Sequence, residues 1–326
     1  MKLIIQIPCY NEEKTLHIAV GDLPKSIPGI DTIETLIIDD GSRDGTVAEA
    51  RRLHIDHIVR FKRNKGLAYG FMAGIDAACR LGADIIVNTD ADNQYNAQDI
   101  EKLVQPILDG TADEVIGARP IETTEHFSVW KKRFQRLGSW VVRNASKTDI
   151  PDAPSGFRAF SREAALRLNV FNEYTYTLET IIQAGRNKIA ITSVPIRTNP
   201  ELRESRLFRS MRAYMQRSAG VIIRAYMMYR PLKFFGVVGA AFFLLGVLLG
   251  VRFLLSGAEG HVQSLILAAI LMLMGAQTFF MGLQADLIAA NRKMLEEIQY
   301  RSRRRDADEA ARASTKNRPD DASENS

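Results

Sequence analysis

Two almost uninterrupted apolar stretches, Phe234 to Leu255 and Val262 to Leu283, constrain the fold of this chain more than any other feature. Each stretch is long enough to cross a bilayer as a helix. A buried helical hairpin is the alternative, but stretches that are apolar on every face would need a protein shell that the remaining sequence does not offer. We therefore predict a transmembrane hairpin, although the mean hydropathy of the whole chain is only -0.11.

The charges beside these stretches predict their orientation. The connecting loop 256–261 has no Lys or Arg, whereas basic residues precede the first stretch and follow the second: Arg224, Arg230, Lys233, Arg292, Lys293, Arg301, Arg303, Arg304 and Arg305. By the positive-inside rule, both termini and the large N-terminal part should lie in the cytoplasm. Arg252 lies near the far end of its span and can snorkel to the opposite interface. Met1 to Ile7 leads straight into a predicted strand, so we expect no signal peptide.

Short apolar runs and helical patterns alternate over most of the first two hundred or so residues, which predicts a mainly parallel sheet with helices on both faces. The expected strands are Lys2–Ile7, Ile33–Ile38, His57–Phe61, Asp84–Val87 and Glu114–Gly117. The expected helices are Glu12–Leu23, Ser42–Leu53, Leu67–Leu81 and Ala97–Leu108.

Acidic side chains follow two of these predicted strands. Asp90-Ala91-Asp92 comes directly after one apolar run, and Asp39-Asp40 ends another, before the turn-rich segment Gly41–Thr46. Ligands of open α/β sheets gather at the carboxyl ends of the strands, so both clusters are predicted to face one crevice. Hard divalent cations that bridge phosphates prefer such oxygen ligands. The alternative is that Asp40, Ser42 and Asp44 only satisfy a turn and a helix N-terminus.

Other residue types exclude several function classes. Cys9 and Cys79 are too few and too far apart for a disulfide framework, and His54 and His57 have no companions that would complete a zinc site. The formal charge of +5 and the pI near 9.2 reflect basic residues that crowd around the apolar stretches. Anionic lipid head groups explain that placement better than nucleic acid does.

Several short motifs occur in a specific order: Ile7-Pro8-Cys9-Tyr10-Asn11-Glu12-Glu13, Asp39 to Thr46, Asn64-Lys65-Gly66, Asp90-Ala91-Asp92-Asn93-Gln94 and Ser155-Gly156-Phe157-Arg158. This ordered set resembles the inverting GT-A glycosyltransferases of the dolichyl-phosphate mannosyltransferase and polyprenyl-phosphate glucosyltransferase type, in glycosyltransferase family 2. The resemblance covers about the first two hundred residues and implies a Rossmann-like α/β catalytic domain. The apolar hairpin resembles the membrane-anchored members of the group.

The implied organisation has four parts. They are a GT-A domain (1–202), a phosphate-binding loop with juxtamembrane amphipathic helices (203–232), the hairpin (233–290) and a basic cytoplasmic tail (291–326). The polar composition from Asp306 to Ser326 predicts disorder there.

The resemblance also implies the residues that bind the donor. Pro8, Tyr10, Glu12 and Asp39 match positions that hold the base and ribose of a nucleotide sugar, and Lys65, Gly66 and Ala91 lie in matching donor motifs. Asp40 is expected to orient its turn. Asp90, Asp92 and Gln94 match the metal and diphosphate site, where Mg²⁺ or Mn²⁺ would neutralise the leaving nucleoside diphosphate.

For the acceptor side, the resemblance implies basic residues and serines. Arg119 resembles an arginine near the phosphates, while Arg133, Arg136 and Ser139 lie where the acceptor phosphate is gripped. Segment 130–145 offers several candidate cations, and a solvated basic helix is the alternative. Ser155 and Arg158 match more clearly. The loop beginning at Arg203 resembles one that closes over the phosphates, without the usual glycine before Glu204.

Arginines from Arg206 to Arg224 interleave with apolar residues, which predicts cationic amphipathic helices at a bilayer surface, broken near Gly220. Polyprenyl phosphate is the acceptor that best fits this placement. A phosphate monoester has a second pKa of about 6, so we expect an inverting displacement without an essential general base.

Several alternatives remain open in the sequence. The nearer competing function is a transferase of this fold that acts on another lipid or glycan acceptor, and the more distant one is a non-catalytic, membrane-tethered nucleotide-sugar sensor. The sequence fixes neither the sugar nor the choice between a UDP- and a GDP-linked donor. Glycines 236, 239, 246 and 250 would suit either a homo-oligomer or close packing within the hairpin.

Overall fold

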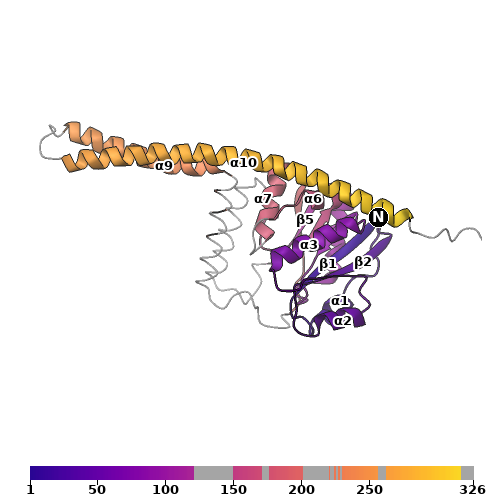
Figure 1. The fold of residues 1–326 in the computed structure, drawn as a ribbon. Coiled ribbons are helices and arrows are strands. Elements are labelled where there is room, and N and C mark those ends of the chain that lie inside the picture. Colours follow the sequence, from indigo (N-terminus) through magenta and orange to yellow (C-terminus); the bar gives the residue numbers. More distant parts are fainter. Residues whose placement is uncertain are drawn as a thin grey trace, which may run out of the picture. The chain divides into compact units, whose positions relative to one another are not determined.

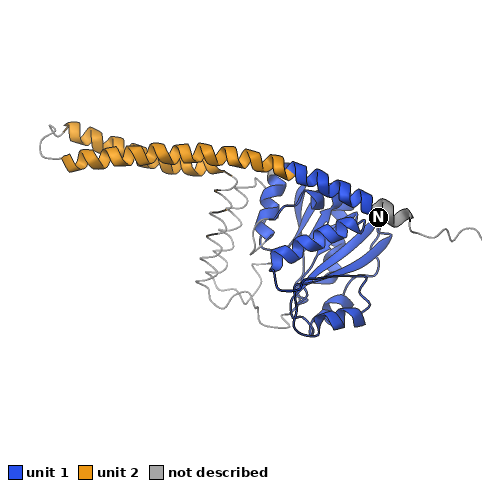
Figure 2. Ribbon diagram, viewed as in Figure 1, with its two compact units in different colours: residues 1–211, 297–326 blue, residues 212–296 orange. Residues whose placement is uncertain are grey.

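The computed structural model describes residues 1–120, 150–170, 176–200, 230–255 and 262–316, together with the single residues 220, 224 and 227. Two compact units divide the chain (Figure 2): residues 1–211 with 297–326, and residues 212–296. We call them the catalytic unit and the hairpin unit, and describe each by itself.

The described part of the catalytic unit contains one seven-stranded sheet in the order β3-β2-β1-β4-β6-β5-β7 (Figure 1). Its strands are β1 (Lys2–Cys9), β2 (Thr32–Asp39), β3 (His57–Arg60), β4 (Ile85–Asn88), β5 (Glu114–Ala118), β6 (Arg158–Ser161) and β7 (Ile191–Pro195). All neighbours pair in parallel except at β6, which is antiparallel to both β4 and β5. The predicted α/β class with a mainly parallel sheet is therefore confirmed.

Helices cover both faces of this sheet. They are α1 (Leu16–Gly21), α2 (Thr46–Arg52), α3 (Leu67–Arg80), the 3-10 turn η1 (Ala97–Asp99), α4 (Ile100–Leu108), α6 (Arg162–Arg167) and α7 (Thr177–Asn187). Alternate residues of β1 point to opposite faces. Leu3, Ile5 and Ile7 join a core with residues of α1, α2 and α4, while Ile4 joins a second core with residues of α3 and α6.

The first two helices begin four residues later than we predicted. Residues 12–15 and 42–45 instead form turns that bind each other. The Asn11 amide donates to Ser42 Oγ at 2.9 Å, and Asp44 accepts from the amides of Glu13 and Thr46. Side-chain acceptors thus satisfy backbone donors that a longer helix would otherwise have used.

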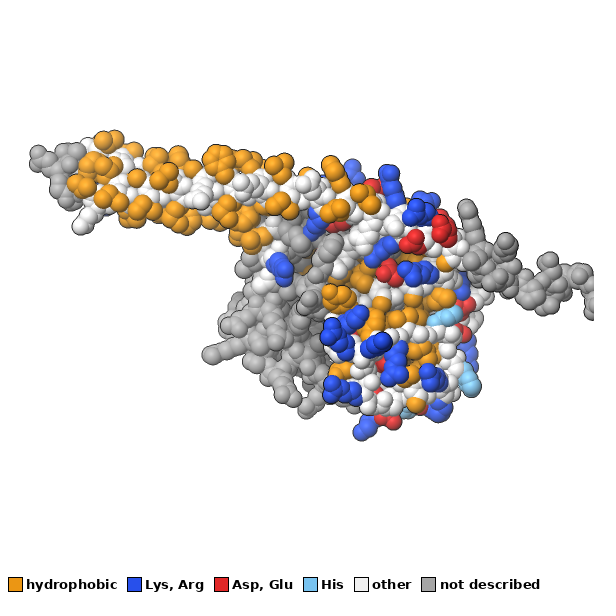
Figure 3. Space-filling model, viewed as in Figure 1, with side chains coloured by type: hydrophobic (Ala, Val, Ile, Leu, Met, Phe, Trp, Pro, Cys, Tyr) orange, Lys and Arg blue, Asp and Glu red, His pale blue; other side chains and the backbone are white. Residues whose placement is uncertain are grey.

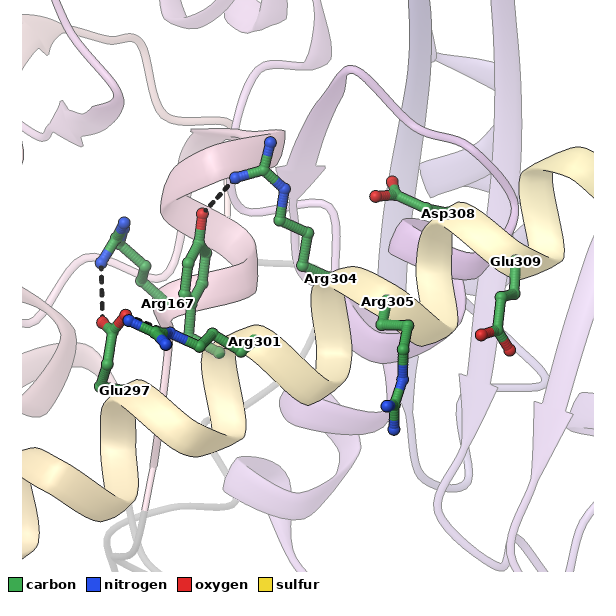
Figure 4. A pocket seen from close by; sticks show the side chains of 8 residues that line it. Arg167, Glu297, Arg301, Arg304, Arg305, Asp308 and Glu309 are labelled. Atoms are coloured by element: carbon green, nitrogen blue, oxygen red, sulfur yellow. Dashed lines mark hydrogen bonds and ion pairs between the residues drawn. The ribbon is translucent and has the colours of Figure 1, made fainter.

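The C-terminal end of α10 (Val262–Lys316) belongs to the catalytic unit, and this corrects the expected disorder from Asp306, because the helix continues to Lys316. Tyr300 and Ala307 are buried in the second core, with residues of α3 and α6. The Tyr300 hydroxyl lies 2.9 Å and 3.0 Å from the two Glu163 carboxylate oxygens. Arg303 pairs with Asp76 of α3 at 3.2 Å. Figure 4 shows the charged side chains around this contact, including Arg167 and Glu297.

The hairpin unit contains α9 (Pro231–Leu255) and the first part of α10, and both helices are long and apolar enough to cross a membrane. Hydrophobic side chains cover their visible surface in Figure 3. A Cβ at Gly239 would lie 2.8 Å from the Gly275 oxygen, and one at Gly246 would lie 2.8 Å from the Ala268 oxygen. Gly236 and Gly250 face open space. Gly239 and Gly246 therefore allow α9 to pack closely on α10, as one of the two alternatives expected.

Candidate active site

The two acidic clusters lie at the same edge of the sheet. β1 pairs in parallel with β2 on one side and with β4 on the other, and Asp39 is in register with Cys9. Asp90 follows two residues after the last residue of β4. The carboxyl ends of three adjacent strands thus bring Asp39, Asp90 and Asp92 to one edge, where open α/β sheets bind ligands.

The segment after β1 presents the residues expected at the nucleoside. Tyr10 is exposed, whereas Glu12 is buried, with one carboxylate oxygen accepting the Thr15 hydroxyl at 2.7 Å. The Asn11 side chain accepts the Arg43 amide at 2.9 Å, and Asn11 itself has a positive φ of 56°. Pro8 precedes them as a half-buried residue of β1. The turns after β1 and β2 are therefore joined by hydrogen bonds and form one rim.

Asp39 and Asp40 have different surroundings. Asp39 is fully buried, and one of its oxygens accepts the Ser42 amide at 2.9 Å. Its other oxygen lies 3.3 Å from Arg60 Nε and makes no hydrogen bond within the described residues. Asp40 instead accepts the amides of Lys65 and Gly66, at 2.7 and 2.9 Å. Asp40 thus has a structural role, but in the loop before α3 and not in its own turn, while Asp39 retains an acceptor for a ligand.

A pocket of about 450 Å³ opens beside Asp39, between the turn after β2 and the segment after β3. Cationic side chains that our sequence reasoning did not include line it: Arg43, Arg60, Lys62 and Arg63. Tyr10 and Phe61 also line the pocket, and Lys65 Nζ lies 4.7 Å from the centre of the Phe61 ring. The basic run that directly follows a strand end was the sequence signal for this pocket.

The segment after β4 carries the predicted metal ligands. Asp90, Asp92 and Gln94 are half-buried, and the buried Ala91 packs into the first core. The backbone amide of Gln94 donates to Asp92 Oδ1 at 3.2 Å, and the backbone carbonyl of Gln94 accepts the backbone amide of Asn199 at 2.9 Å. These contacts hold the acidic loop against the chain that follows β7.

The donor set of this loop fits a magnesium or manganese ion. Among the described residues, no group of three or more His, Cys, Asp or Glu side chains gathers as a metal site. Mg²⁺ needs no such cage, because it commonly binds through one or two carboxylates plus substrate phosphates and water. Asp90, Asp92 and the Gln94 amide oxygen supply hard oxygen donors of this type at an accessible strand end.

The segment Ser155–Arg158 lies against Asp90. A Cβ added to Gly156 would be 3.4 and 3.5 Å from the Asp90 carboxylate oxygens. Ser155 is fully buried, and its hydroxyl has no hydrogen-bond partner in the described part of the chain. An unpartnered buried hydroxyl is costly, and the ligand contact that we predict for Ser155 would give it a partner.

Arg158 is placed differently from our expectation of a catalytic contact. Its side chain is fully buried and pairs with Glu114 at 3.2 Å. Its guanidinium also donates to the carbonyls of Ala153 and Ser155, each at 2.8 Å, and to Thr180 Oγ1. Arg158 is fully buried and bonds only protein groups among these contacts, so it holds this loop in place and is not exposed to a substrate. Burial raises the pKa of Glu114, while Arg158 opposes that shift.

Arg119 follows β5 and is largely buried. Its guanidinium binds Asp152 in a bidentate arrangement, with distances of 2.7 Å from Nε and 3.0 Å from Nη2. Burial alone would lower the pKa of Arg119, but Tyr95, Asp152 and Asp90 raise it above its usual value. Arg119 is therefore a permanent cation that interacts electrostatically with Asp90, and its place near the phosphates stays a prediction.

Several predicted residues lie outside the described part of the chain. They are Arg133, Arg136, Ser139 and Arg203, together with most of the amphipathic segment 206–227. Their assignment to the acceptor phosphate and to the bilayer surface remains a prediction.

Two family models match this chain: glycosyl transferase family 2 over residues 4–168, and the GtrB C-terminal hairpin over residues 230–290. A UDP-N-acetylglucosamine--dolichyl-phosphate N-acetylglucosaminyltransferase of Methanococcus voltae is 33% identical over 217 residues, which cover 59% of this chain and 83% of the relative. A polyprenol monophosphomannose synthase of Mycolicibacterium smegmatis is 27% identical over 206 residues, covering 60% and 76%.

A solved structure shares the fold. Glucosyl-3-phosphoglycerate synthase from Mycobacterium tuberculosis, crystallised with Mn²⁺, UDP and phosphoglyceric acid, superposes with a TM-score of 0.53 at 17% identity. The match covers 69% of this chain and 77% of that one. With its motifs in the expected order, its sheet of the expected type and its sequence matched over half its length, the chain belongs to glycosyl transferase family 2.

Proposed function

We propose that this protein transfers a hexose from a UDP- or GDP-linked sugar to a polyprenyl phosphate at the cytoplasmic face of the cell membrane. The observation that carries the proposal is the meeting of Asp39, Asp90 and Asp92 at the carboxyl edge of β2, β1 and β4. The names of the Methanococcus and Mycolicibacterium relatives, which refer to dolichyl phosphate and polyprenol, support the acceptor class.

The donor nucleoside would bind along the rim formed by the turns after β1 and β2. Asp39 offers one buried carboxylate oxygen without a hydrogen bond, which suits an N–H or O–H donor of a base or ribose. Tyr10 and Phe61 offer aromatic surface in the adjoining pocket. Asp40 holds the amides of Lys65 and Gly66, so that this loop keeps its shape when the nucleotide arrives.

Asp90, Asp92 and Gln94 would hold Mg²⁺ or Mn²⁺ beside the donor diphosphate. A divalent cation bound there supplies positive charge that stabilises the leaving nucleoside diphosphate. Arg119, fixed by Asp152, adds a permanent positive charge close to Asp90. Electrostatic stabilisation of the leaving group is thus built largely from groups that are already in place.

The acceptor needs positioning more than it needs activation. A phosphate monoester is largely ionised near neutrality, because its second pKa is about 6. We therefore propose a single in-line displacement that inverts the anomeric carbon, with no carboxylate or histidine as an essential base. The residues proposed to grip the acceptor phosphate are Arg136, Ser139, Ser155 and Arg203.

The hairpin would anchor the enzyme where its acceptor lies. Both α9 and α10 meet the length and hydropathy of membrane spans, and the matching hairpin model supports this role. Exposed basic residues that directly follow the second span, such as Lys293, would face anionic head groups on the cytoplasmic side.

The test is transfer of labelled sugar by the full chain, purified in detergent. Undecaprenyl or dolichyl phosphate and Mg²⁺ or Mn²⁺ are incubated with labelled UDP-glucose, UDP-N-acetylglucosamine, UDP-galactose or GDP-mannose, and label is counted in the organic phase. We expect lipid-linked label from one donor. If every donor binds but none yields lipid-linked label, the acceptor assignment is wrong, and the non-catalytic sensor or a different acceptor takes its place.

A further inference from the structure

The loop that lies against Asp90 is held by buried polar side chains that lie outside the family motifs quoted above. The Gly156 amide donates to the Tyr95 hydroxyl at 3.1 Å. On the other side of the same residue, the Gly156 carbonyl accepts Asn88 Nδ2 at 2.9 Å and the Tyr176 hydroxyl at 3.3 Å. Both backbone polar groups of Gly156 are therefore fixed by side chains.

These side chains are themselves rigidly supported. Asn88 Nδ2 also donates to the Tyr176 hydroxyl at 2.9 Å, and Asn88 Oδ1 accepts Gln6 Nε2 at 2.9 Å. The Tyr176 ring stacks on Phe71 with centroids 3.8 Å apart, and the Tyr95 ring stacks on Phe157 at 5.0 Å. Asn88, Tyr95 and Tyr176 are all buried. The Asn88 side chain and both backbone groups of Gly156 are thus satisfied, although Gln6 Oε1 has no hydrogen-bond partner in the described residues. Such buried hydrogen bonds restrict a loop to one position.

Gly156 has no side chain for a steric reason. A Cβ there would lie 3.0 Å from the Tyr176 hydroxyl and within 3.5 Å of both Asp90 oxygens. Gly156 therefore borders the space between the Tyr176 hydroxyl and the Asp90 carboxylate, and a Cβ there would be in van der Waals contact with Asp90. A shift of the Gly156 backbone would change the space that is available to Asp90.

We propose that Tyr95, Asn88 and Tyr176 are positioning residues that clamp the backbone amide and carbonyl of Gly156 and thereby set the orientation of the Asp90 carboxylate for the metal and diphosphate. This inference rests on the proposed function, because it assigns Asp90 to the metal. Mg²⁺ requires near-ideal octahedral geometry at about 2.0–2.1 Å, so small errors in carboxylate orientation weaken binding. Losing an outer partner of a metal ligand typically costs about 10- to 100-fold in affinity or activity.

Two isosteric variants, Tyr95→Phe and Tyr176→Phe, test the clamp. Each removes one hydroxyl and keeps the stacked ring, so the core remains filled. The matched control is Tyr300→Phe, which removes a buried hydroxyl from the contact between α10 and Glu163. Mn²⁺ is titrated into each full-length protein in detergent, with UDP or GDP present, and free Mn²⁺ is measured by electron paramagnetic resonance.

We expect the two clamp variants to bind Mn²⁺ about tenfold more weakly than the parent protein, and Tyr300→Phe to bind it equally well. Sugar transfer by the clamp variants should then need a correspondingly higher Mn²⁺ concentration. A purely structural role would lower the thermal unfolding midpoint and leave Mn²⁺ binding by the folded protein unchanged.

The outcomes separate this inference from the proposed function. If the parent protein binds Mn²⁺ with a nucleotide, and both clamp variants bind it equally well, the clamp is overturned while the proposed function stands. If the parent protein binds no Mn²⁺ with either nucleotide, the metal assignment of Asp90 is overturned, and the clamp falls with it.

Discussion

At the scale of single residues, neighbouring carboxylates in this protein have distinct tasks that depend on their partners. Both carboxylate oxygens of Asp40 accept hydrogen bonds from backbone amides. Asp39, in contrast, has one buried oxygen without a hydrogen bond in the described residues. Asp92 accepts a long hydrogen bond of 3.2 Å from the backbone amide of Gln94. Position in the motif alone does not separate these roles.

Replacing Asp92 by Asn tests the metal assignment at this scale. The substitution keeps the size of the side chain and removes its charge, so the fold should survive. We expect sugar transfer to fall by at least about 100-fold, since losing an outer-shell partner alone costs about 10- to 100-fold. Initial rates at saturating Mg²⁺ measure this loss, and a thermal midpoint close to that of the parent protein is the control for folding. Substantial remaining activity would show that Asp92 is not a metal ligand.

At the scale of elements, ion pairs connect segments that are distant in sequence. Asp99, in η1, is fully buried and binds Arg197 beyond β7 as well as Lys102 of α4, at 2.8 Å each. Burial would raise the pKa of Asp99, but hydrogen bonds from Arg197 and Lys102 outweigh it and lower that pKa to about 2. The ordinary value is 3.8.

This pKa predicts a pH-dependent contribution to stability. A carboxylate with a lowered pKa in the folded state stabilises the protein above its unfolded pKa, and the stabilisation is lost as pH falls toward the folded pKa. Asp99→Asn should therefore cost about 1–2 kcal/mol near pH 6, allowing for the exposed cationic partners, and progressively less between about pH 4 and 2. Thermal unfolding of both proteins across this range measures the difference. A difference that stayed constant down to pH 2 would contradict the assignment.

The contact between the end of α10 and the rest of the catalytic unit leads to a second prediction at this scale. Tyr300 is buried, bonds Glu163 and has the Arg167 guanidinium 3.9 Å from its ring centre. Tyr300→Ala should destabilise the catalytic unit by about 3 kcal/mol, as expected for truncating a buried aromatic side chain. Ile298→Ala, on the same helix and 64% exposed, is the control and should change stability by less than about 0.5 kcal/mol. Equal thermal midpoints for the two variants would refute the contact.

At the scale of the whole molecule, one continuous helix joins the two units, because α10 runs from Val262 in the hairpin unit to Lys316 in the catalytic unit. The chain therefore enters and leaves the hairpin unit from the catalytic unit, through segment 212–230 and through α10. By the positive-inside rule, we predict that both parts of the catalytic unit lie on one side of a membrane.

The predicted topology is open to labelling with a membrane-impermeant maleimide. Cys9 and Cys79 are buried, and burial raises the pKa of both thiols, so background reaction should be low. Ser256→Cys, in the connecting loop, should react in intact cells, whereas Ser302→Cys should react only after the membrane is permeabilised. The reverse labelling pattern would show that the hairpin has the opposite orientation in the membrane.

The sequence by itself determined the features that short-range patterns encode. Apolar runs of membrane-spanning length predicted the hairpin, alternating strand and helix patterns predicted the sheet, and ordered motifs predicted the acidic edge with Asp39, Asp90 and Asp92. Such patterns are visible in one dimension, because hydrophobic periodicity and strand-end motifs involve residues that are close in the chain.

Only the tertiary structure decided which residues act through others. Arg158 matched a motif, yet its buried position depends on Glu114 and Thr180, which are 44 and 22 residues away. Gly156 is clamped by Tyr95, 61 residues earlier in the chain. Residues 306–316 have a composition typical of disorder, but the helix that contains them is docked through Tyr300 and Ala307. Contacts between distant segments fix burial and hydrogen bonding, and no local pattern in the chain records which segments will meet.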